Sequence, residues 1–135
     1  MANKVLLVMQ RKLLSDALIA RAASDLRFSL IAEGNYASAA LTAEATSPAI
    51  ILVEIPESGP WKAAEKCLAL CDVMRARQVD CKPVILCSEN DETACRAAIQ
   101  AKQARRIDDF VFYDNSVHYL FSKLEALLEQ PTQQK

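Results

Sequence analysis

Five short apolar runs alternate with longer segments that carry apolar residues at helical spacing, and this alternation constrains the fold of the 135-residue chain more than any other feature. Strands that alternate with helices in this way are typical of βα units around a parallel sheet. The third and fourth runs are almost entirely apolar, as expected for central strands that helices cover on both faces. The runs are 4–8 (KVLLV), 28–32 (FSLIA), 49–55 (AIILVEI), 83–88 (PVILCS) and 109–113 (DFVFY).

The segments between and after these runs predict five helices, two of them over 11–25 and 36–46. In the other three, apolar or small residues recur at intervals of three and four, which is the spacing of one helix face. Asn90 or Asp91 is the expected N-cap of the fourth helix. The stripes are Ala64, Cys67, Leu68 and Cys71 in the third helix, Ala94, Ala97, Ala98, Ala101 and Ala104 in the fourth, and Val117, Leu120, Phe121, Leu124, Leu127 and Leu128 in the fifth.

A fivefold βα alternation predicts a doubly wound α/β domain of the flavodoxin-like (βα)5 type, with a parallel five-stranded sheet of order 2-1-3-4-5. The length fits one domain. We expect this domain over residues 1–129, followed at 130–135 by a disordered tail or the start of a linker. In such folds the site lies where strands one and three end.

Composition narrows the classes of function. The formal net charge of −1 provides no basic excess for binding nucleic acid. Charges interrupt every apolar run, so none approaches the roughly 20 residues of a membrane span. An odd number of cysteines, five, and no signal-peptide pattern predict a cytoplasmic protein with reduced thiols.

Four segments resemble the response-regulator receiver family, the CheY-like domains of two-component signal transduction and phosphorelays. They are KVLLV followed by MQRKLLSDAL, then FSLIAEG, IILVEIPESG and KPVILCS, and together they span nearly the whole chain. The pattern is closest to receivers of the NarL or FixJ type, which usually precede a LuxR-type DNA-binding output domain. The resemblance implies a regulatory module and no enzyme.

The resemblance also locates a phosphorylation site. In the family, two acidic residues after strand one hold Mg²⁺, an aspartate ending strand three accepts the phosphoryl group, and a Ser/Thr, a switch aromatic and a lysine respond to it. The corresponding residues here are Met9 and Gln10 for the acidic pair, Glu54 for the aspartate, Ser88 for the hydroxyl, Phe110 for the aromatic and Tyr113 for the lysine.

These replacements predict a site without its chemistry. Mg²⁺ requires oxygen ligands, usually with carboxylates among them, so the thioether of Met9 and the neutral amide of Gln10 predict weak or absent binding. Phosphoryl transfer depends on metal ions and cations, which leaves Glu54 without electrostatic support. We therefore expect a pseudo-receiver with no cofactor, no metal and no catalytic residue, which signals through protein contacts.

Several alternatives remain open at this stage. Glu54 is either a solvated strand end or a mimic of the phosphorylated state, in which Ser88 bonds to it and Phe110 packs inward. Tyr113 either hydrogen-bonds to Glu54 or fills the volume of the lysine. Two other functions compete: a weak phospho-acceptor that uses Glu54, and a small-molecule module in which Met9, Tyr113 and Phe110 line an apolar pocket.

The remaining candidate residues have simpler interpretations. Cys67 and Cys71 are expected in the core, because they share a stripe with apolar residues and have no partner at zinc-site spacing. His118 is expected at the surface, and Glu57 and Ser58 in solvent.

In receivers, the face formed by the fourth helix, fifth strand and fifth helix commonly docks partners. The resemblance therefore suggests Arg105, Arg106, Asp109 and Lys123 as contacts for a protein partner or a homodimer.

Overall fold

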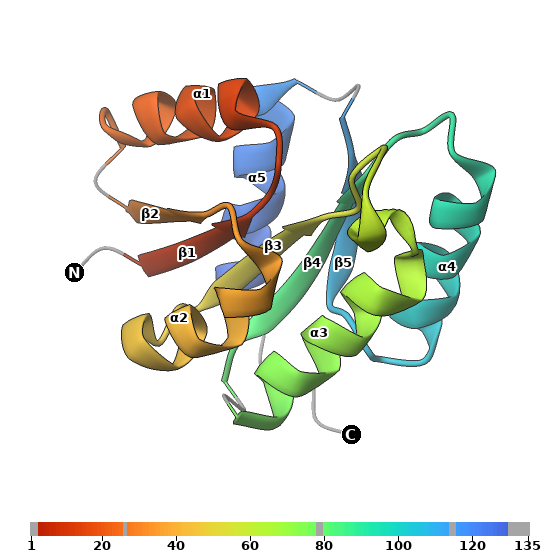
Figure 1. Ribbon diagram of the computed structural model, residues 1–135. Coiled ribbons are helices and arrows are strands. Elements are labelled where there is room, and N and C mark those ends of the chain that lie inside the picture. Colours follow the sequence, from red (N-terminus) through yellow and green to blue (C-terminus); the bar gives the residue numbers. More distant parts are fainter. Residues whose placement is uncertain (1–2, 26, 78–79, 114–115, 130–135) are drawn as a thin grey trace.

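The computed structural model describes residues 3–25, 27–77, 80–113 and 116–129, and the expected tail at 130–135 lies outside this part of the chain. Strands and helices alternate along its whole length (Figure 1). They are β1 (Asn3–Val8), α1 (Lys12–Ala22), β2 (Phe28–Glu33), α2 (Ala39–Thr46), β3 (Ile50–Glu54), α3 (Ala64–Arg77), β4 (Lys82–Cys87), α4 (Glu92–Gln103), β5 (Asp109–Phe112) and α5 (Val117–Leu128). Short 3-10 turns at Tyr36–Ser38 and Pro60–Lys62 precede α2 and α3.

All strand pairs are parallel, and the sheet order is β2-β1-β3-β4-β5. The predicted fold class is therefore confirmed. Val8 pairs with Val53, so β1 and β3 end side by side. Every residue of β3 and β4 is buried, which explains why these two runs are so uniformly apolar.

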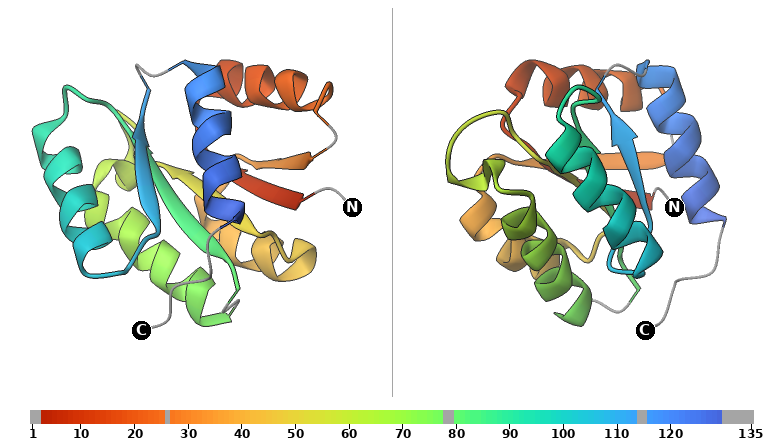
Figure 2. Two further views of the ribbon diagram at one scale, coloured as in Figure 1. Left: turned by 180° about the vertical axis from the view of Figure 1, so that it is seen from behind. Right: turned by 90° about the vertical axis from the view of Figure 1, so that its right-hand side faces the viewer.

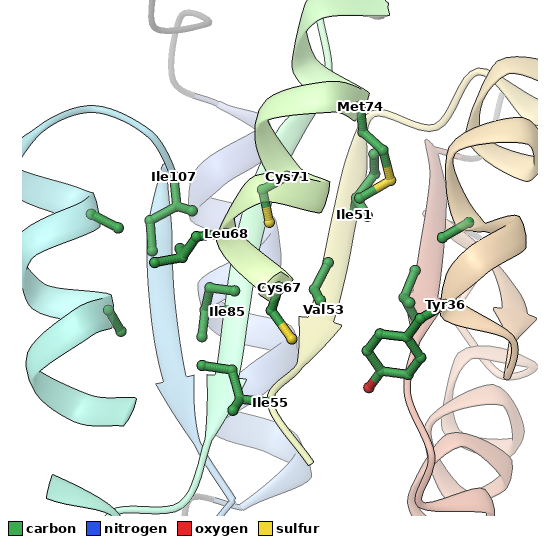
Figure 3. Packing of buried hydrophobic residues seen from close by; sticks show 14 of the residues in the cluster. Tyr36, Ile51, Val53, Ile55, Cys67, Leu68, Cys71, Met74, Ile85 and Ile107 are labelled. Carbon is green, nitrogen blue, oxygen red and sulfur yellow. The ribbon is translucent and has the colours of Figure 1, made fainter. Parts of the chain in front are cut away.

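Helices cover both faces of the sheet: α1 and α5 lie on one face, and α2, α3 and α4 on the other (Figure 2). Successive strand residues point to opposite faces, so Leu6 of β1 joins the cluster under α2–α4 while Leu7 joins the cluster under α1 and α5. Figure 3 shows Cys67 and Cys71 of α3 within the first cluster, as predicted. Each fully buried large aliphatic side chain contributes roughly 1.5–3 kcal/mol.

Helix α4 ends earlier than its alanine stripe predicts. Asp91 is its N-cap and accepts a hydrogen bond from the Ala94 N–H, but the helix stops at Gln103 and Ala104 is exposed. Arg105 has a φ of 62°. The Arg106 N–H donates to Ala101 O and the Arg105 N–H to Lys102 O, the Schellman pattern that normally uses glycine. The left-handed residue turns the chain into β5, so the prediction for Ala104 is wrong.

Strand ends differ from the predicted runs by one residue, and these differences matter for the site. Ile55, Ser88 and Tyr113 each lie just beyond the end of β3, β4 or β5. Their side chains therefore lie at the edge of the sheet. Within the described residues, no helix combines the length and apolar character needed to cross a membrane.

Candidate functional site

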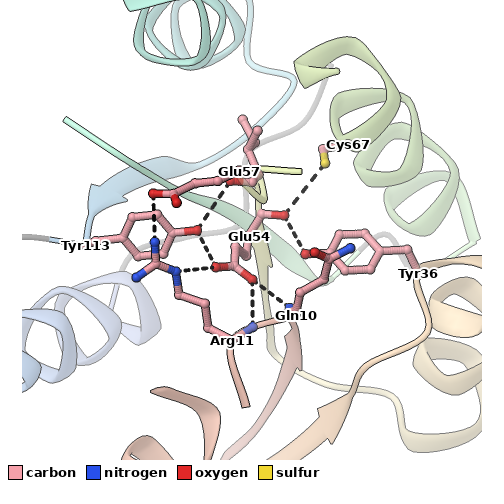
Figure 4. Close-up of polar contacts among 8 residues, drawn as sticks. Gln10, Arg11, Tyr36, Glu54, Glu57, Cys67 and Tyr113 are labelled. Atoms are coloured by element: carbon pink, nitrogen blue, oxygen red, sulfur yellow. Dashed lines mark hydrogen bonds and ion pairs between the residues drawn. The ribbon is translucent and has the colours of Figure 1, made fainter. Parts of the chain in front are cut away.

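Glu54 is the last residue of the central strand β3 and is completely buried, with 0% exposure. A carboxylate at the end of a parallel strand would ordinarily be hydrated. Here the loop after β1 and the side chain of Tyr113 after β5 close over it (Figure 4). The interpretation of Glu54 as a solvated strand end is therefore wrong.

Both oxygens of the Glu54 carboxylate are fully engaged. Oε1 accepts hydrogen bonds from the main-chain N–H groups of Gln10, at 2.6 Å, and Arg11, at 3.2 Å. Oε2 accepts from the Tyr113 hydroxyl and forms an ion pair with Arg11 Nε at 3.5 Å. A carboxylate offers about four acceptor positions. The protein itself supplies three hydrogen-bond donors and one ion-pair partner to this carboxylate.

Arg11 is the cation of this site and was missed by the sequence reasoning. Its guanidinium lies 4.1 Å from the centre of the Tyr113 ring, and Nη2 pairs with Glu57 Oε1 at 2.7 Å. Glu54 therefore has electrostatic support, contrary to expectation. Glu57 is exposed, as predicted, but it holds Arg11 from the solvent side. A cation three residues after the end of β1 was the available signal.

Tyr113 forms the hydrogen bond to Glu54, which decides between its two predicted roles. Burial, followed by the hydrogen bond to Glu54 and the charge of that carboxylate, raises the pKa of Tyr113. The phenol therefore stays protonated and acts as a neutral donor. At the lysine position of the receiver pattern this chain thus carries an uncharged group.

A second set of contacts fixes the main chain of Glu54. Its carbonyl oxygen accepts a hydrogen bond from the Tyr36 hydroxyl at 2.6 Å and a weaker one from Cys67 Sγ at 3.7 Å. The Tyr36 ring lies 5.2 Å from the ring of Trp61. Burial raises the pKa of Tyr36, and that of Cys67 to about 12, so both remain donors.

The other predicted site residues do not converge on Glu54. Met9 is 4% exposed and packs under α1 and α5, whereas Phe110 packs against the cluster on the opposite face. Tyr113 packs on the same face as Met9, but the sheet separates both from Phe110, so the predicted apolar pocket of Met9, Tyr113 and Phe110 is wrong. Ser88 Oγ accepts from the Asn90 N–H at 3.2 Å. It is not bonded to Glu54 as the mimic hypothesis required.

Two spaces adjoin the site. One, beside Tyr113, Leu14 and Val117, measures about 20 Å³, room for about one water molecule. The other is an open cleft of about 740 Å³ between the loop after β3 and the start of α4, and Ser88 lies at its edge. Gly59, Ala63 and Ala94 give the cleft a shallow lining of small side chains.

The predicted partner-contact residues divide between two places. Asp109 is 8% exposed and accepts from Lys102 at 3.1 Å and Lys123 at 2.8 Å, which ties α4 to α5. Burial raises the pKa of Asp109, but hydrogen bonds from Lys123, from the main chain and from Lys102 outweigh this and lower it. Arg105 is exposed.

Arg106 lies elsewhere. Its guanidinium turns toward α3, where it pairs with Glu65 at 2.8 Å and Asp72 at 2.7 Å. Arg106 therefore contributes to the packing of the loop before β5 on α3 and does not join Asp109 and Lys123.

His118 and the cysteines expected in the core behave as predicted. His118 is exposed, and four of the five cysteines are buried, with Cys95 partly exposed. Among the described residues, no three or more His, Cys, Asp or Glu side chains form a group that could hold a metal ion.

No family model and no curated protein matches this sequence. Solved structures do match. A response regulator from Thermotoga maritima is 16% identical with a TM-score of 0.78, over 96% of this chain and 100% of that one. The N-terminal domain of the nisin resistance regulator NsrR is 19% identical with a TM-score of 0.77, over 96% and 100%. A LuxR-family DNA-binding response regulator from Staphylococcus aureus is 15% identical with a TM-score of 0.73, over 93% and 98%. Over nearly its whole length, this chain therefore has the fold of response-regulator receiver domains.

Proposed function

We propose that this protein is an atypical receiver, a pseudo-receiver that acts in signal transduction or transcription regulation through protein–protein contacts, independent of aspartyl phosphorylation. One observation carries the proposal. The carboxylate at the phospho-acceptor position is buried, and donors of the same chain occupy its acceptor positions.

The donor set does not fit Mg²⁺. The ion needs about six oxygen ligands in near-octahedral geometry. Met9 places its side chain in the core, and Gln10 engages Glu54 through its main-chain N–H. Glu54 would have to release Arg11 or Tyr113 before it could offer an oxygen. No step of the proposed function therefore involves a metal.

The same contacts disfavour phosphoryl transfer. A carboxylate oxygen must present a free lone pair to the phosphorus atom, and cations must neutralise the moving group. Arg11 is already committed to Glu54 and Glu57, and Tyr113 is a neutral donor. In effect Arg11 takes the place of an external cation. We infer that the protein holds a single conformation at this edge of the sheet.

Contacts with partners then carry the function. The proposed surface is the α4–β5–α5 face, which consists of Ile99 and Lys102 of α4, Asp109 of β5, and Tyr119 and Lys123 of α5. Ile99 and Tyr119 are each 43% exposed, beside the bridge that Lys102, Asp109 and Lys123 form. Such a surface suits a protein partner or a second copy, whereas the chain's net charge of −1 does not favour nucleic acid.

The test is incubation with Mg²⁺ and either acetyl phosphate or beryllofluoride. Intact mass, melting temperature and the fluorescence of Trp61, the single tryptophan, should stay unchanged. A receiver with the full acidic site serves as the positive control in the same buffers. A Mg²⁺-dependent mass gain or thermal shift would contradict the proposal.

The same experiment separates the competing phospho-acceptor function. If acetyl phosphate adds a phosphoryl group to the protein and Glu54→Gln abolishes this mass gain, Glu54 is a weak acceptor after all. If the mass gain persists in Glu54→Gln, another residue accepts the phosphoryl group, and the proposal fails for a different reason. The expected result is no mass gain in either protein.

A further inference from the structure

Two cysteines lie close together where β4 passes into α4. Cys87 is the last residue of β4, and Cys95 lies in the first half of α4. All five cysteines fall in the described segments, and Cys95 is the one among them that is not buried, whereas Cys87 has 0% exposure. Cys95 packs against the cluster of buried residues that contains Cys87.

Hydrogen bonds hold the Cys95 sulfur at the end of β4. Cys95 Sγ donates to Ser88 O at 3.3 Å and approaches Glu89 O at 3.6 Å, and Ser88 directly follows Cys87. Burial, followed by the charge and the hydrogen bond of the neighbouring Cys95, raises the pKa of the Cys87 thiol to about 12. The Cys95 sulfur is therefore held against the residue that follows Cys87, and Cys95 is the partly exposed member of the pair.

We propose that Cys95 and Cys87 are a reversible redox pair, in which Cys95 reacts first with a peroxide and Cys87 then closes a disulfide. This inference rests on the two thiols and stands apart from the function of the Glu54 site.

The chemistry balances with hydrogen peroxide as the oxidant. The Cys95 sulfur attacks one peroxide oxygen, the O–O bond breaks, water leaves, and Cys95 becomes a sulfenic acid. The Cys87 sulfur then attacks the Cys95 sulfur, the S–O bond breaks, and a second water carries away the thiol proton. The two thiols are oxidised by two electrons, and the peroxide is reduced to two waters.

Accessibility selects Cys95 among the five cysteines as the first to react. Cys67, Cys71 and Cys81 are buried, and burial raises the pKa of each thiol, that of Cys81 to about 11. Buried, weakly acidic thiols react poorly with oxidants. Cys95 is therefore the expected point of first attack, and its neighbour Cys87 resolves the intermediate.

A Cys87–Cys95 bond would join the end of β4 to α4 across the loop between them. Ser88, the loop residues Asn90 and Asp91, and the first residues of α4, Glu92–Ala94, form one wall of the cleft of about 740 Å³. The disulfide would tether the loop between β4 and α4 and fix the start of α4 against the sheet. Oxidation would therefore act on the shape of the cleft and on the position of α4.

Treatment with hydrogen peroxide, followed by intact mass measurement and peptide mapping, tests the proposal. We expect a loss of about 2 Da, the two thiol hydrogens, that dithiothreitol reverses, and a Cys87–Cys95 cross-linked peptide. Cys95→Ser and Cys87→Ala should each abolish the cross-link. Cys81→Ala, a buried cysteine outside the pair, is the matched control and should retain it.

Because Cys87 is fully buried, its variant carries a risk for folding, and the partly exposed Cys95→Ser carries the decisive comparison. Circular dichroism establishes that this variant is folded. An unchanged mass, oxygen addition at Cys95 without a cross-link, a disulfide between other cysteines or a dimer linked through Cys95 would each overturn the proposal.

Discussion

Two buried acids lie at opposite ends of the strands of the same sheet, each with an arginine partner. Glu54 lies at the carboxyl end of β3, and Asp108 lies just before the amino end of β5. The difference is in the arginine: the Arg11 side chain is 46% exposed, whereas that of Arg75 is 7% exposed. The ion pair at the carboxyl end of the strands is therefore partly exposed to solvent and is called the wet pair. The ion pair at the amino end is buried and is called the dry pair.

The dry pair is built around the Arg75 guanidinium. Arg75 Nη2 pairs with Asp108, and Nη1 donates to Arg105 O at 2.6 Å, but Arg75 Nε is buried with no hydrogen-bond partner among the described residues. Burial raises the pKa of Asp108 despite the opposing charges of Arg75 and Lys82. Glu54 instead has two main-chain donors, a phenol and a cation. Redundant, mostly neutral donors allow a carboxylate to be buried without reliance on a single charge.

The largest expected effect is that of Arg75→Met, which removes the dry cation and leaves Asp108 buried. Breaking one side of a buried pair costs about 3–5 kcal/mol of unfolding free energy. Urea denaturation measures it. A loss below about 1 kcal/mol would contradict the view that this end depends on Arg75.

That loss should also depend on pH. The pKa of Asp108 is already raised above its ordinary value of 3.8, and removal of Arg75 should raise it further. The folded variant then binds a proton on Asp108 more tightly than the unfolded chain does. The contribution of Asp108 to stability is therefore fully present below the unfolded pKa and is lost as pH rises through the folded pKa. The difference between Arg75→Met and the unmodified protein should therefore be smaller at pH 4 than at pH 7. A constant difference would point to lost packing in place of an unpaired charge.

An intermediate effect is expected from Tyr113→Phe. This change removes one donor from the buried Glu54 carboxylate and preserves the ring that Arg11 covers. Hydrogen bonds to charged groups contribute about 1.5–3 kcal/mol, and we expect a loss in this range by the same denaturation assay. Tyr119→Phe, on a side chain that is 43% exposed, is the matched control and should change stability by less than about 0.5 kcal/mol. Equal effects of the two variants would remove the special role of Tyr113.

The smallest effect is expected from Arg11→Met, the same substitution as at Arg75 but at the wet pair. Water can replace a half-exposed guanidinium, and Glu54 keeps its main-chain donors and Tyr113. Partly exposed pairs contribute about 0–1 kcal/mol and are screened by salt. The loss should therefore shrink in 1 M salt. If Arg11→Met costs as much as Arg75→Met, the contrast between the two edges is wrong.

The sequence predicted the frame of the Glu54 site but not its closure. The strand runs placed Met9, Gln10, Glu54 and Tyr113 at strand ends, because parallel strands end at one edge. The role of Arg11 was not predicted, since it follows from how one flexible side chain folds over Tyr113. The burial of Glu54 was equally hidden, because it depends on loops from three strands meeting over one residue.

The charged segment before β5 shows the same limit. The resemblance suggested that Arg106 and Asp109 share one docking face, yet Asp108 and Asp109 are buried and Arg106 reaches α3. One left-handed residue, Arg105, turns the chain and decides where each of these side chains points. A run of charges does not reveal such a turn when its pivotal residue is not glycine.

By itself, the sequence determined the order of strands and helices, the uniformly buried centre of the sheet and the edge at which the altered receiver residues gather. The periodicity and spacing of apolar residues are local properties that can be read directly from the sequence. Only the tertiary structure decided that Gln10, Arg11 and Tyr113 enclose Glu54, and that Arg11 of the same chain compensates its charge. Hydrogen bonds between residues 43 to 59 positions apart depend on the packing of whole elements, which no local pattern specifies.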